Sequence, residues 1–233
     1  MKYLHLYNSQ TDYDNKKNTL ILPSASLIEE NNHVEYNPHH DFVEIAGIKW
    51  ATMNVGAKSI TDYGLYFQWG DTQGYTKDEI EKEHKKAFVD NFSDYNIDLM
   101  TKYNSNGMTL ELEDDAVNAA WGGSWRMPTV GDFQKLCDAV NTEWKTNYQG
   151  SGVNGLLCST KTEPSKTLFF PACGDVTNGT FYAENEIGFY WLNSLSTDNL
   201  SYACALDLSS KSTTNWFKYI RCDGFTVRGV LDD

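Results

Sequence analysis

The chain has 233 residues, of which 40% are hydrophobic and 14% aromatic, and its formal net charge is −13. This length allows one substantial domain plus an appendage. The acidic balance excludes a nucleic-acid partner, whose phosphates must be neutralised by Lys and Arg. No run approaches the ~20 apolar residues of a membrane span, and the first residues lack the apolar stretch of a signal peptide. We therefore expect no membrane partner, and assembly in the cytoplasm.

Residues 1–40 are predicted to form an N-terminal arm, and residues 41–233 a folded domain. The arm is polar and contains no tryptophan. Its Glu30-Asn31-Asn32 segment lies between two runs that contain apolar residues, a pattern that predicts a β-hairpin. A segment this small cannot bury enough surface to fold alone, so it docks on its own domain or on a partner, and we expect a partner. The residues expected to anchor it are apolar: Leu4, Leu6, Leu20, Ile21, Ile28, Val34 and Tyr36.

The domain begins with a predicted strand pair at residues 42–50, where apolar and polar residues alternate around an Ala46-Gly47 turn. Residues 66–69 predict another strand, 76–88 a charged surface helix and 90–106 a long loop. An acidic cluster follows, made of Glu111, Glu113, Asp114 and Asp115. Carboxylates can hold calcium, but no EF-hand spacing is present. We expect these side chains to mark the N-terminus of a short helix, where negative charge is favoured.

Residues 121–140 predict a turn followed by a helix. Trp121 and Trp125 flank Gly122-Gly123, so two large aromatic side chains lie on either side of a conformationally permissive backbone segment. Thr129 is a good N-cap, and Asp132 completes a capping-box-like pattern. Apolar residues then recur at the i, i+3, i+4, i+7 spacing of one helix face, at Phe133, Leu136, Cys137 and Val140. This face is expected to pack on the core.

The rest of the chain favours strands, at residues 168–170, 189–191, 202–208, 216–217 and 225–230. Aromatic and β-branched residues supply these segments, and Gly, Asn, Ser and Thr separate them. The sequence therefore predicts an α+β fold with an antiparallel sheet and short helices.

No catalytic or metal-binding constellation is visible. The five cysteines stand singly, without a CxxC pair, and are expected to be structural thiols. The histidines fall in the arm or the charged helix, at His5, His33, His39, His40 and His84. The adjacent pair of histidines suits a solvated linker better than a metal site. We expect no enzyme activity, no metal and no cofactor.

Arg126-Met127-Pro128-Thr129, followed by Asp132-Phe133, resembles the Arg-Leu-Pro-Thr-x-x-Glu-Trp signature of C-type-lectin-like and formylglycine-generating-enzyme folds. Further segments, in order, are similar to the Fibrobacter succinogenes major paralogous domain, at residues 48–57, 66–71, 121–129, 153–155, 168–172, 188–191 and 224–228. This resemblance covers residues 42–230. It implies a C-type-lectin-like fold in which the first and last strands pair.

The arm carries a second resemblance. Its pattern is similar to the N-termini of structural proteins in crAss-like Bacteroides phages, through Ser26, Ile28, Glu29, Val34, Tyr36, Asn37 and Pro38. The resemblance implies that the arm attaches the chain to other virion proteins, such as capsid or fibre subunits.

Resemblance to the lectin and enzyme folds does not by itself imply a binding or catalytic activity, because proteins that share a fold can have different functions. The enzyme needs a reactive cysteine pair, and only Cys173 and Cys222 stand outside apolar patterns. Calcium-dependent lectins use Glu-Pro-Asn and Trp-Asn-Asp, which Glu163-Pro164-Ser165 and Trp191-Leu192-Asn193 match poorly. What remains is a polar-aromatic set suited to sugar or protein recognition, Trp191, Asn193, Asn215, Trp216 and Tyr219. The alternative is that the two tryptophans are core residues.

The function expected from these features is that of a non-enzymatic phage virion accessory protein, a head fibre or capsid-decoration subunit. It would form a homo-oligomer and display its lectin-like domain to a glycan or another bacterial surface ligand. The first alternative is a bacterial surface or secreted binding protein of the same family. The second is an oxidase of the formylglycine-generating kind.

Overall fold

The computed structural model divides the chain into two compact units, Met1–Asn37 and Pro38–Asp233. It describes residues 3–7, 19–23, 40–82, 88, 102–103, 108–211 and 215–233. In the first unit, β1 (Tyr3–Tyr7) pairs antiparallel with β2 (Thr19–Pro23). The division between the units lies close to the boundary predicted at residue 40.

The four predicted arm anchors that the structure describes all lie in this hairpin. Leu4 and Leu6 belong to β1, Leu20 and Ile21 belong to β2, and Leu6 is the register partner of Leu20. The other predicted anchors, Ile28, Val34 and Tyr36, lie outside the described residues, as does the hairpin predicted around Glu30-Asn31-Asn32.

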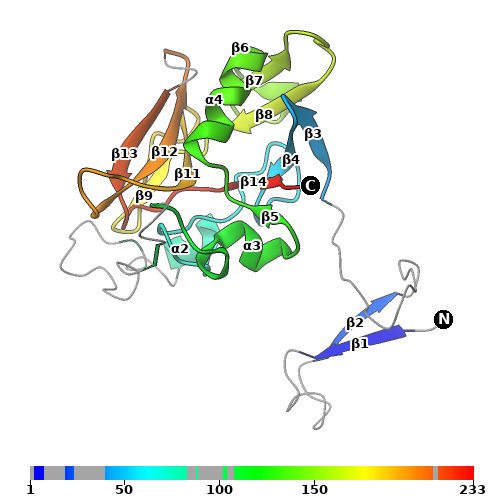
Figure 1. The fold of residues 1–233 in the computed structure, drawn as a ribbon, viewed down its shortest axis with the longest axis vertical. Helices are drawn as coiled ribbons and strands as arrows, with labels where there is room; N and C mark the ends of the chain where they lie inside the picture. Colours follow the sequence, from blue (N-terminus) through cyan, green and yellow to red (C-terminus); the bar gives the residue numbers. More distant parts are fainter. Residues whose placement is uncertain are drawn as a thin grey trace. The chain divides into compact units, whose positions relative to one another are not determined.

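The second unit is rich in antiparallel sheet and has few short helices, which confirms the predicted α+β class (Figure 1). One sheet has the order β3 (Phe42–Ile45), β4 (Ile48–Asn54), β14 (Arg228–Leu231), β5 (Trp125–Arg126). A second contains β6 (Val140–Lys145), β7 (Gly155–Thr160) and β8 (Thr167–Pro171), and a third β11 (Ile187–Leu195), β12 (Tyr202–Ser209) and β13 (Asn215–Ile220). The strands β9 (Asp175–Thr177) and β10 (Thr180–Tyr182) form a small ribbon.

Among the described residues the helices are α2 (Lys77–Lys82), α3 (Ala116–Trp121) and α4 (Val130–Ala139), with 3₁₀ turns at η4 (Leu112–Asp114) and η5 (Tyr148–Gly150). Helix α4 lies between the β6–β8 sheet and the β11–β13 sheet (Figure 1). The opening hairpin β3–β4 meets the last strand, because β4 pairs with β14. The two ends of the unit therefore lie side by side.

The opening hairpin confirms the predicted strand pair at residues 42–50. Ile45 pairs with Ile48 across a two-residue turn, in which Ala46 has φ 52° and Gly47 has φ 75°. Positive φ at both central residues is the condition for the turn type whose twist matches the flanking strands.

Three predicted elements differ from the observed ones. Helix α4 ends at Ala139, and Val140 opens β6 opposite Thr160 of β7, so the predicted helical stripe is one residue too long. Residues 66–69 make isolated bridges, Tyr66 with Tyr75 and Phe67 with Phe225, and not a strand. The predicted surface helix is seen as α2, with Ile80 buried; residues 83–87 lie outside the described part.

Both predicted helix N-termini are capped by side chains in the structure. The Thr129 hydroxyl accepts the Asp132 backbone N–H, and the Asp132 carboxylate accepts the Thr129 N–H, which confirms the capping box. Asp115 caps α3 by accepting the N–H groups of Val117 and Asn118, and it also accepts the N–H of Met127 at 2.7 Å. The acidic cluster therefore supplies a helix N-terminus, and one of its carboxylates ties that helix to the segment before α4.

The described core contains two large clusters and a small third one around Tyr66 and Ile80, and the strands between the two large clusters are buried on both sides. Along β11, Tyr190 and Leu192 face the first cluster, whereas Phe189 and Trp191 face the second. We call the first the α4 core, which includes Trp50, Phe133, Leu136, Phe170, Tyr190, Leu192, Leu206 and Val230. We call the second the α3 core, which includes Trp69, Val117, Trp121, Trp125, Phe189, Trp191 and Phe225. Burial of each such side chain contributes roughly 1.5–3 kcal/mol.

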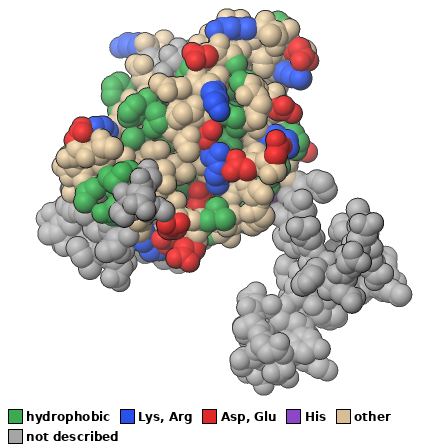
Figure 2. All heavy atoms as spheres, in the orientation of Figure 1, with side chains coloured by type: hydrophobic (Ala, Val, Ile, Leu, Met, Phe, Trp, Pro, Cys, Tyr) green, Lys and Arg blue, Asp and Glu red, His purple; other side chains and the backbone are tan. Residues whose placement is uncertain are grey.

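The surface of the second unit mixes both signs of charge. Acidic and basic side chains lie interspersed on the face drawn in Figure 2. Several form exposed ion pairs, such as Lys82 with Asp78 at 2.9 Å and Lys166 with Glu163 at 2.8 Å. Such pairs contribute little to stability. None of the helices that the structure describes is long and apolar enough to cross a membrane.

A pair of half-buried carboxylates near β9 is held by one hydroxyl. The Thr177 hydroxyl lies 3.3 Å from a carboxylate oxygen of Asp175 and 3.1 Å from one of Asp223. It has a single proton, so it donates to one carboxylate at a time. Burial raises the pKa of Asp175 to about 6, and burial together with the charge of Asp175 raises the pKa of Asp223 to about 7.

We expect the free energy of unfolding to be lower at pH 8 than at pH 5 by roughly 2–4 kcal/mol, the upper value being the full effect of both pKa shifts and the lower value allowing for the partial solvent exposure of the two carboxyl groups. An unfolded aspartate has a pKa of about 3.9, so between pH 4 and 7 the folded chain binds more protons, and stability falls as pH rises through this window. Asp223→Asn should raise stability at pH 8 and reduce the difference, as measured by urea unfolding. Asp138→Asn, at an exposed carboxylate, is the control. A wild type equally stable at both pH values would contradict the expectation.

Candidate functional site

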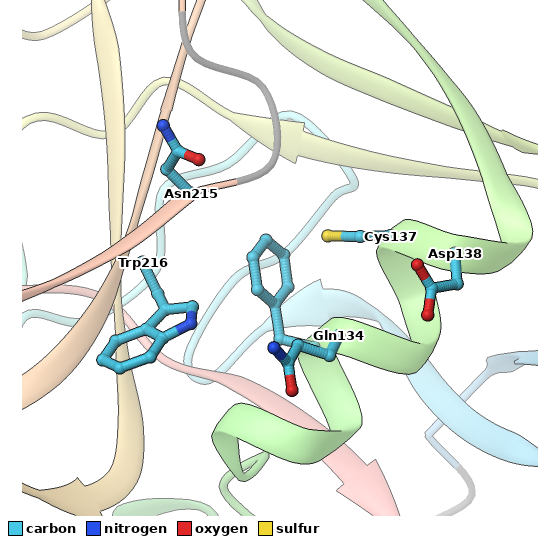
Figure 3. A pocket seen from close by; sticks show the side chains of 6 residues that line it. Gln134, Cys137, Asp138, Asn215 and Trp216 are labelled. Atoms are coloured by element: carbon cyan, nitrogen blue, oxygen red, sulfur yellow. The ribbon is translucent and has the colours of Figure 1, made fainter.

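A pocket of about 510 Å³ lies between helix α4 and strand β13. Six side chains line it, from Phe133, Gln134, Cys137, Asp138, Asn215 and Trp216. Figure 3 shows Gln134, Cys137 and Asp138 on the helix and Asn215 and Trp216 on the strand. The pocket therefore contains two of the five residues predicted to bind a ligand.

The helix contributes its side of the pocket through a run of neighbours on one flank. Phe133, Gln134, Cys137 and Asp138 follow the i, i+1, i+4, i+5 spacing that places side chains near one another on a helix surface. Phe133 is also buried in the α4 core, and the capping box at Thr129 fixes where the helix begins. Gln134 and Asp138 are exposed at the mouth.

The other side of the pocket is formed by the edge strand of a sheet. β13 is the last strand of the β11–β12–β13 sheet, and Trp216 lies opposite Leu206 of β12. Trp216 is half-buried and packs against the α4 core, so one part of its indole is anchored and another part is accessible. Asn215, the first residue of the strand, is exposed beside it.

The pocket offers binding groups of three kinds. Phe133 and Trp216 supply aromatic surface, Gln134 and Asn215 supply amides that donate and accept hydrogen bonds, and Asp138 supplies a carboxylate. Burial, with a smaller effect of Asp138, raises the pKa of the Cys137 thiol to about 11, so this thiol is protonated at neutral pH. A protonated thiol is a poor nucleophile, and the arrangement favours binding over catalysis.

Trp191 and Asn193 do not belong to the pocket. Trp191 is 0% exposed, its ring stacks on Phe225 at 4.3 Å, and its indole N–H donates to the Phe67 carbonyl at 2.8 Å. Asn193 is 8% exposed, and its backbone bonds to Pro128 and Leu110. Their assignment to a binding face is corrected, because β11 is the buried strand between the two cores.

Tyr219 lies apart from the pocket as well. Its ring packs on Phe189 and Phe225 of the α3 core, and its hydroxyl donates to the Asp207 carboxylate at 2.9 Å. Trp216 packs against the other core, so these two β13 residues face opposite sides of the sheet. Of the predicted set, only Asn215 and Trp216 line the pocket, whereas Trp191 and Tyr219 both pack on Phe225 in the α3 core.

Four pocket residues were not predicted from the sequence. Gln134 and Asp138 are polar positions of an amphipathic helix, where the default expectation is solvent, and Phe133 and Cys137 were assigned to the apolar stripe. Nothing in their local pattern indicates β13, which is about eighty residues away in the sequence. Only the packing of α4 beside the β11–β13 sheet joins them to Trp216.

A second pocket, of about 560 Å³, lies near α2 and includes Tyr66 and Lys77. Its main polar groups are already engaged. The Lys77 ammonium pairs with the Glu184 carboxylate at 2.6 Å, and the Tyr66 hydroxyl donates to the Cys173 carbonyl at 2.7 Å.

The cysteines give no sign of an activated thiol. None of the five forms a disulfide, and both Cys173 and Cys222 are buried in the interior. Burial raises the pKa of Cys173 to about 11 and that of Cys158 to about 12. A reactive cysteine needs the opposite, an accessible site that lowers the thiol pKa.

Within the described ranges, no group of three or more His, Cys, Asp or Glu side chains is placed to hold a metal ion. Of the predicted linker pair, His39 lies outside the described residues, and His40 stacks on Trp121 with ring centroids 4.1 Å apart. No protein-family model, curated protein or solved structure matches the chain. The function proposed for this chain therefore rests on the chain's own residues and their geometry.

Proposed function

We propose that this chain is a non-enzymatic phage virion accessory protein, a head fibre or capsid-decoration subunit. Its second unit recognises a ligand on the bacterial surface through the α4–β13 pocket. The observation that carries this proposal is the pocket itself, which combines an accessible tryptophan with exposed amides and a protonated thiol. Such a lining binds and orients a ligand without supplying an activated nucleophile.

The proposal includes a C-type-lectin-like fold for the second unit. Two observations support it: the opening hairpin pairs with the last strand, and segments that carry the family resemblance meet in the interior. Trp50, Trp69, Tyr190 and Phe225 come from four of those segments, and all are buried. A sequence signature that supplies a shared core indicates a shared scaffold more than a shared activity.

Attachment through the arm is the second part of the proposal. The first unit is compact by itself, and its described strands form one two-stranded hairpin. A lone hairpin is at best marginally stable in water, and its free edges can pair with another chain. The phage-like pattern of the arm favours capsid or fibre proteins, or a sister subunit, as that chain.

Deleting residues 1–38 should leave a folded, soluble protein that no longer joins the particle. The deletion removes the arm but keeps His40, which stacks on Trp121 in the second unit. Particles from the source would be purified and their proteins identified by mass spectrometry, with the full chain as control. Normal incorporation of the truncated chain would contradict the role of the arm. A chain found in the bacterial envelope and missing from particles would favour the surface-protein alternative.

Binding of the purified chain to bacterial cells tests the recognition role. Fluorescently labelled wild type should bind host cells, and Trp216→Ala should bind at least tenfold less. Phe217→Ala is the matched control, because Phe217 is the next residue of β13, is 47% exposed and does not line the pocket. Equal binding by all three proteins would exclude the pocket as the recognition site.

A further inference from the structure

We propose that the ligand of the α4–β13 pocket is an uncharged sugar ring, which stacks on Trp216 and is oriented by Gln134 and Asn215. This inference rests on the proposed recognition function and names the chemical class of its ligand. Three properties of the pocket carry it: its aromatic wall, its pair of amides and its charge.

The aromatic wall fits the shape of a sugar. A pyranose ring has an apolar C–H face and a polar edge of hydroxyl groups, so it needs a flat apolar surface with hydrogen-bonding groups around it. Trp216 provides such a surface, since it is anchored in the core on one side and half-exposed on the other. Its indole projects from β13 toward α4 (Figure 3). Aromatic side chains of this kind give large contact area at low entropic cost.

The amides fit the edge of the ring. A hydroxyl group both donates and accepts a hydrogen bond, and an Asn or Gln side chain carries two donors and one acceptor oxygen. Gln134 stands on the helix and Asn215 on the strand, so the two amides approach the pocket from different elements. Adjacent hydroxyls of one ring can be paired by such amides, which gives orientation as well as affinity.

The charge of the pocket excludes an acidic sugar. Asp138 is its one charged lining residue, and no lysine or arginine is among the described residues that line it. The Cys137 thiol, whose pKa is raised to about 11 by burial, is neutral and adds no charge. A carboxylate or phosphate on the ligand would meet Asp138 without a compensating positive group, on a chain whose net charge is already −13. Uronic acids, sialic acids and phosphorylated sugars are therefore disfavoured.

Isothermal titration of the full chain with neutral trisaccharides of N-acetylglucosamine, mannose, galactose and glucose tests the inference. At least one should bind with a Kd below about 1 mM. Trp216→Ala should weaken that binding at least tenfold, whereas Trp216→Phe should keep most of it and Phe217→Ala all of it. Gln134→Ala and Asn215→Ala, at exposed positions, should each weaken it several-fold; they keep the test valid should Trp216→Ala fail to fold.

The expected preference for neutral over acidic sugars is tested by oxidising the C6 hydroxymethyl groups of the best-binding trisaccharide to carboxylates. The oxidised sugar should bind at least tenfold more weakly than the neutral one. Asp138→Asn should reduce this difference in affinity. Glu113→Gln removes the same charge from an exposed site outside the pocket and should leave the difference in affinity unchanged.

Preference for the oxidised sugar, or no binding of any neutral sugar, would overturn the inference. If all the sugars fail while wild type still binds cells and Trp216→Ala does not, the sugar class is wrong and the recognition role of the pocket stands. If wild type does not bind cells either, both the inference and the proposed recognition role fail.

Discussion

Replacing Arg228 by methionine is expected to lower the free energy of unfolding by about 3–5 kcal/mol. The guanidinium is 1% exposed and donates to four oxygen atoms, the Asn54 side-chain oxygen at 2.7 Å and the carbonyls of Ala51, Thr52 and Phe169 at 3.0–3.2 Å. It thereby connects β14 to β4 and to β8. Methionine fills part of the volume but leaves these buried acceptors without a donor.

The four acceptors of Arg228 are uncharged, so the expected loss comes from unsatisfied hydrogen bonds and not from a broken ion pair. Arg228→Lys should recover little, because an ammonium cannot reproduce the planar fork of donors. The comparison is Arg126→Met on β5, next to β14, where the half-buried Arg126 pairs with Asp232 at 2.7 Å and with Asp132 at 2.8 Å. Urea unfolding should give a smaller loss for this variant, roughly 1–2 kcal/mol, because its guanidinium is partly exposed to solvent. Equal losses for Arg126→Met and Arg228→Met would contradict the argument.

Replacing Trp125 by alanine is expected to cost about 3–5 kcal/mol of unfolding free energy, the usual effect of removing a large buried aromatic side chain. Trp125 is 2% exposed in the α3 core. Its ring meets Trp121 edge-on at 5.0 Å and His40 at 5.8 Å. The cavity would therefore open where the chain enters the second unit, and His40 and Trp121 would lose packing together.

Trp144→Ala provides the comparison for Trp125, because Trp144 is only half-buried at the edge of the α4 core. We expect it to cost clearly less than Trp125→Ala in the same chemical denaturation experiment. A loss below about 1 kcal/mol for Trp125→Ala would mean that the side chain contributes little to the folded state. Trp125→Phe should lower the free energy of unfolding by less than Trp125→Ala does, since it keeps an aromatic ring but still leaves part of the cavity.

Features that depend on neighbours along the chain could be predicted from the amino-acid sequence alone. The Ala46-Gly47 turn, the Thr129–Asp132 capping box and the strands at residues 168–170, 189–191 and 202–208 were predicted from short-range spacing, and the structure contains them, the strands as parts of β8, β11 and β12. The short strands β9 and β10 were not predicted. The energies of the predicted features come from contacts within a few residues, so a local pattern is enough to specify them. The same holds for the α+β class, which follows from the number and type of such segments.

Which of these elements contact one another depends on long-range packing in the folded chain. Trp191 and Trp216 both lie in strand-like aromatic segments, yet β11 is covered by a core on each face while β13 is the edge of its sheet. Burial depends on neighbours far away in sequence, such as Phe67 beside Trp191 and α4 beside Trp216. The local pattern carries no information on these partners, because the free energy that selects them comes from long-range packing. For that reason the pocket, and with it Gln134, Cys137 and Asp138, emerged only from the folded chain.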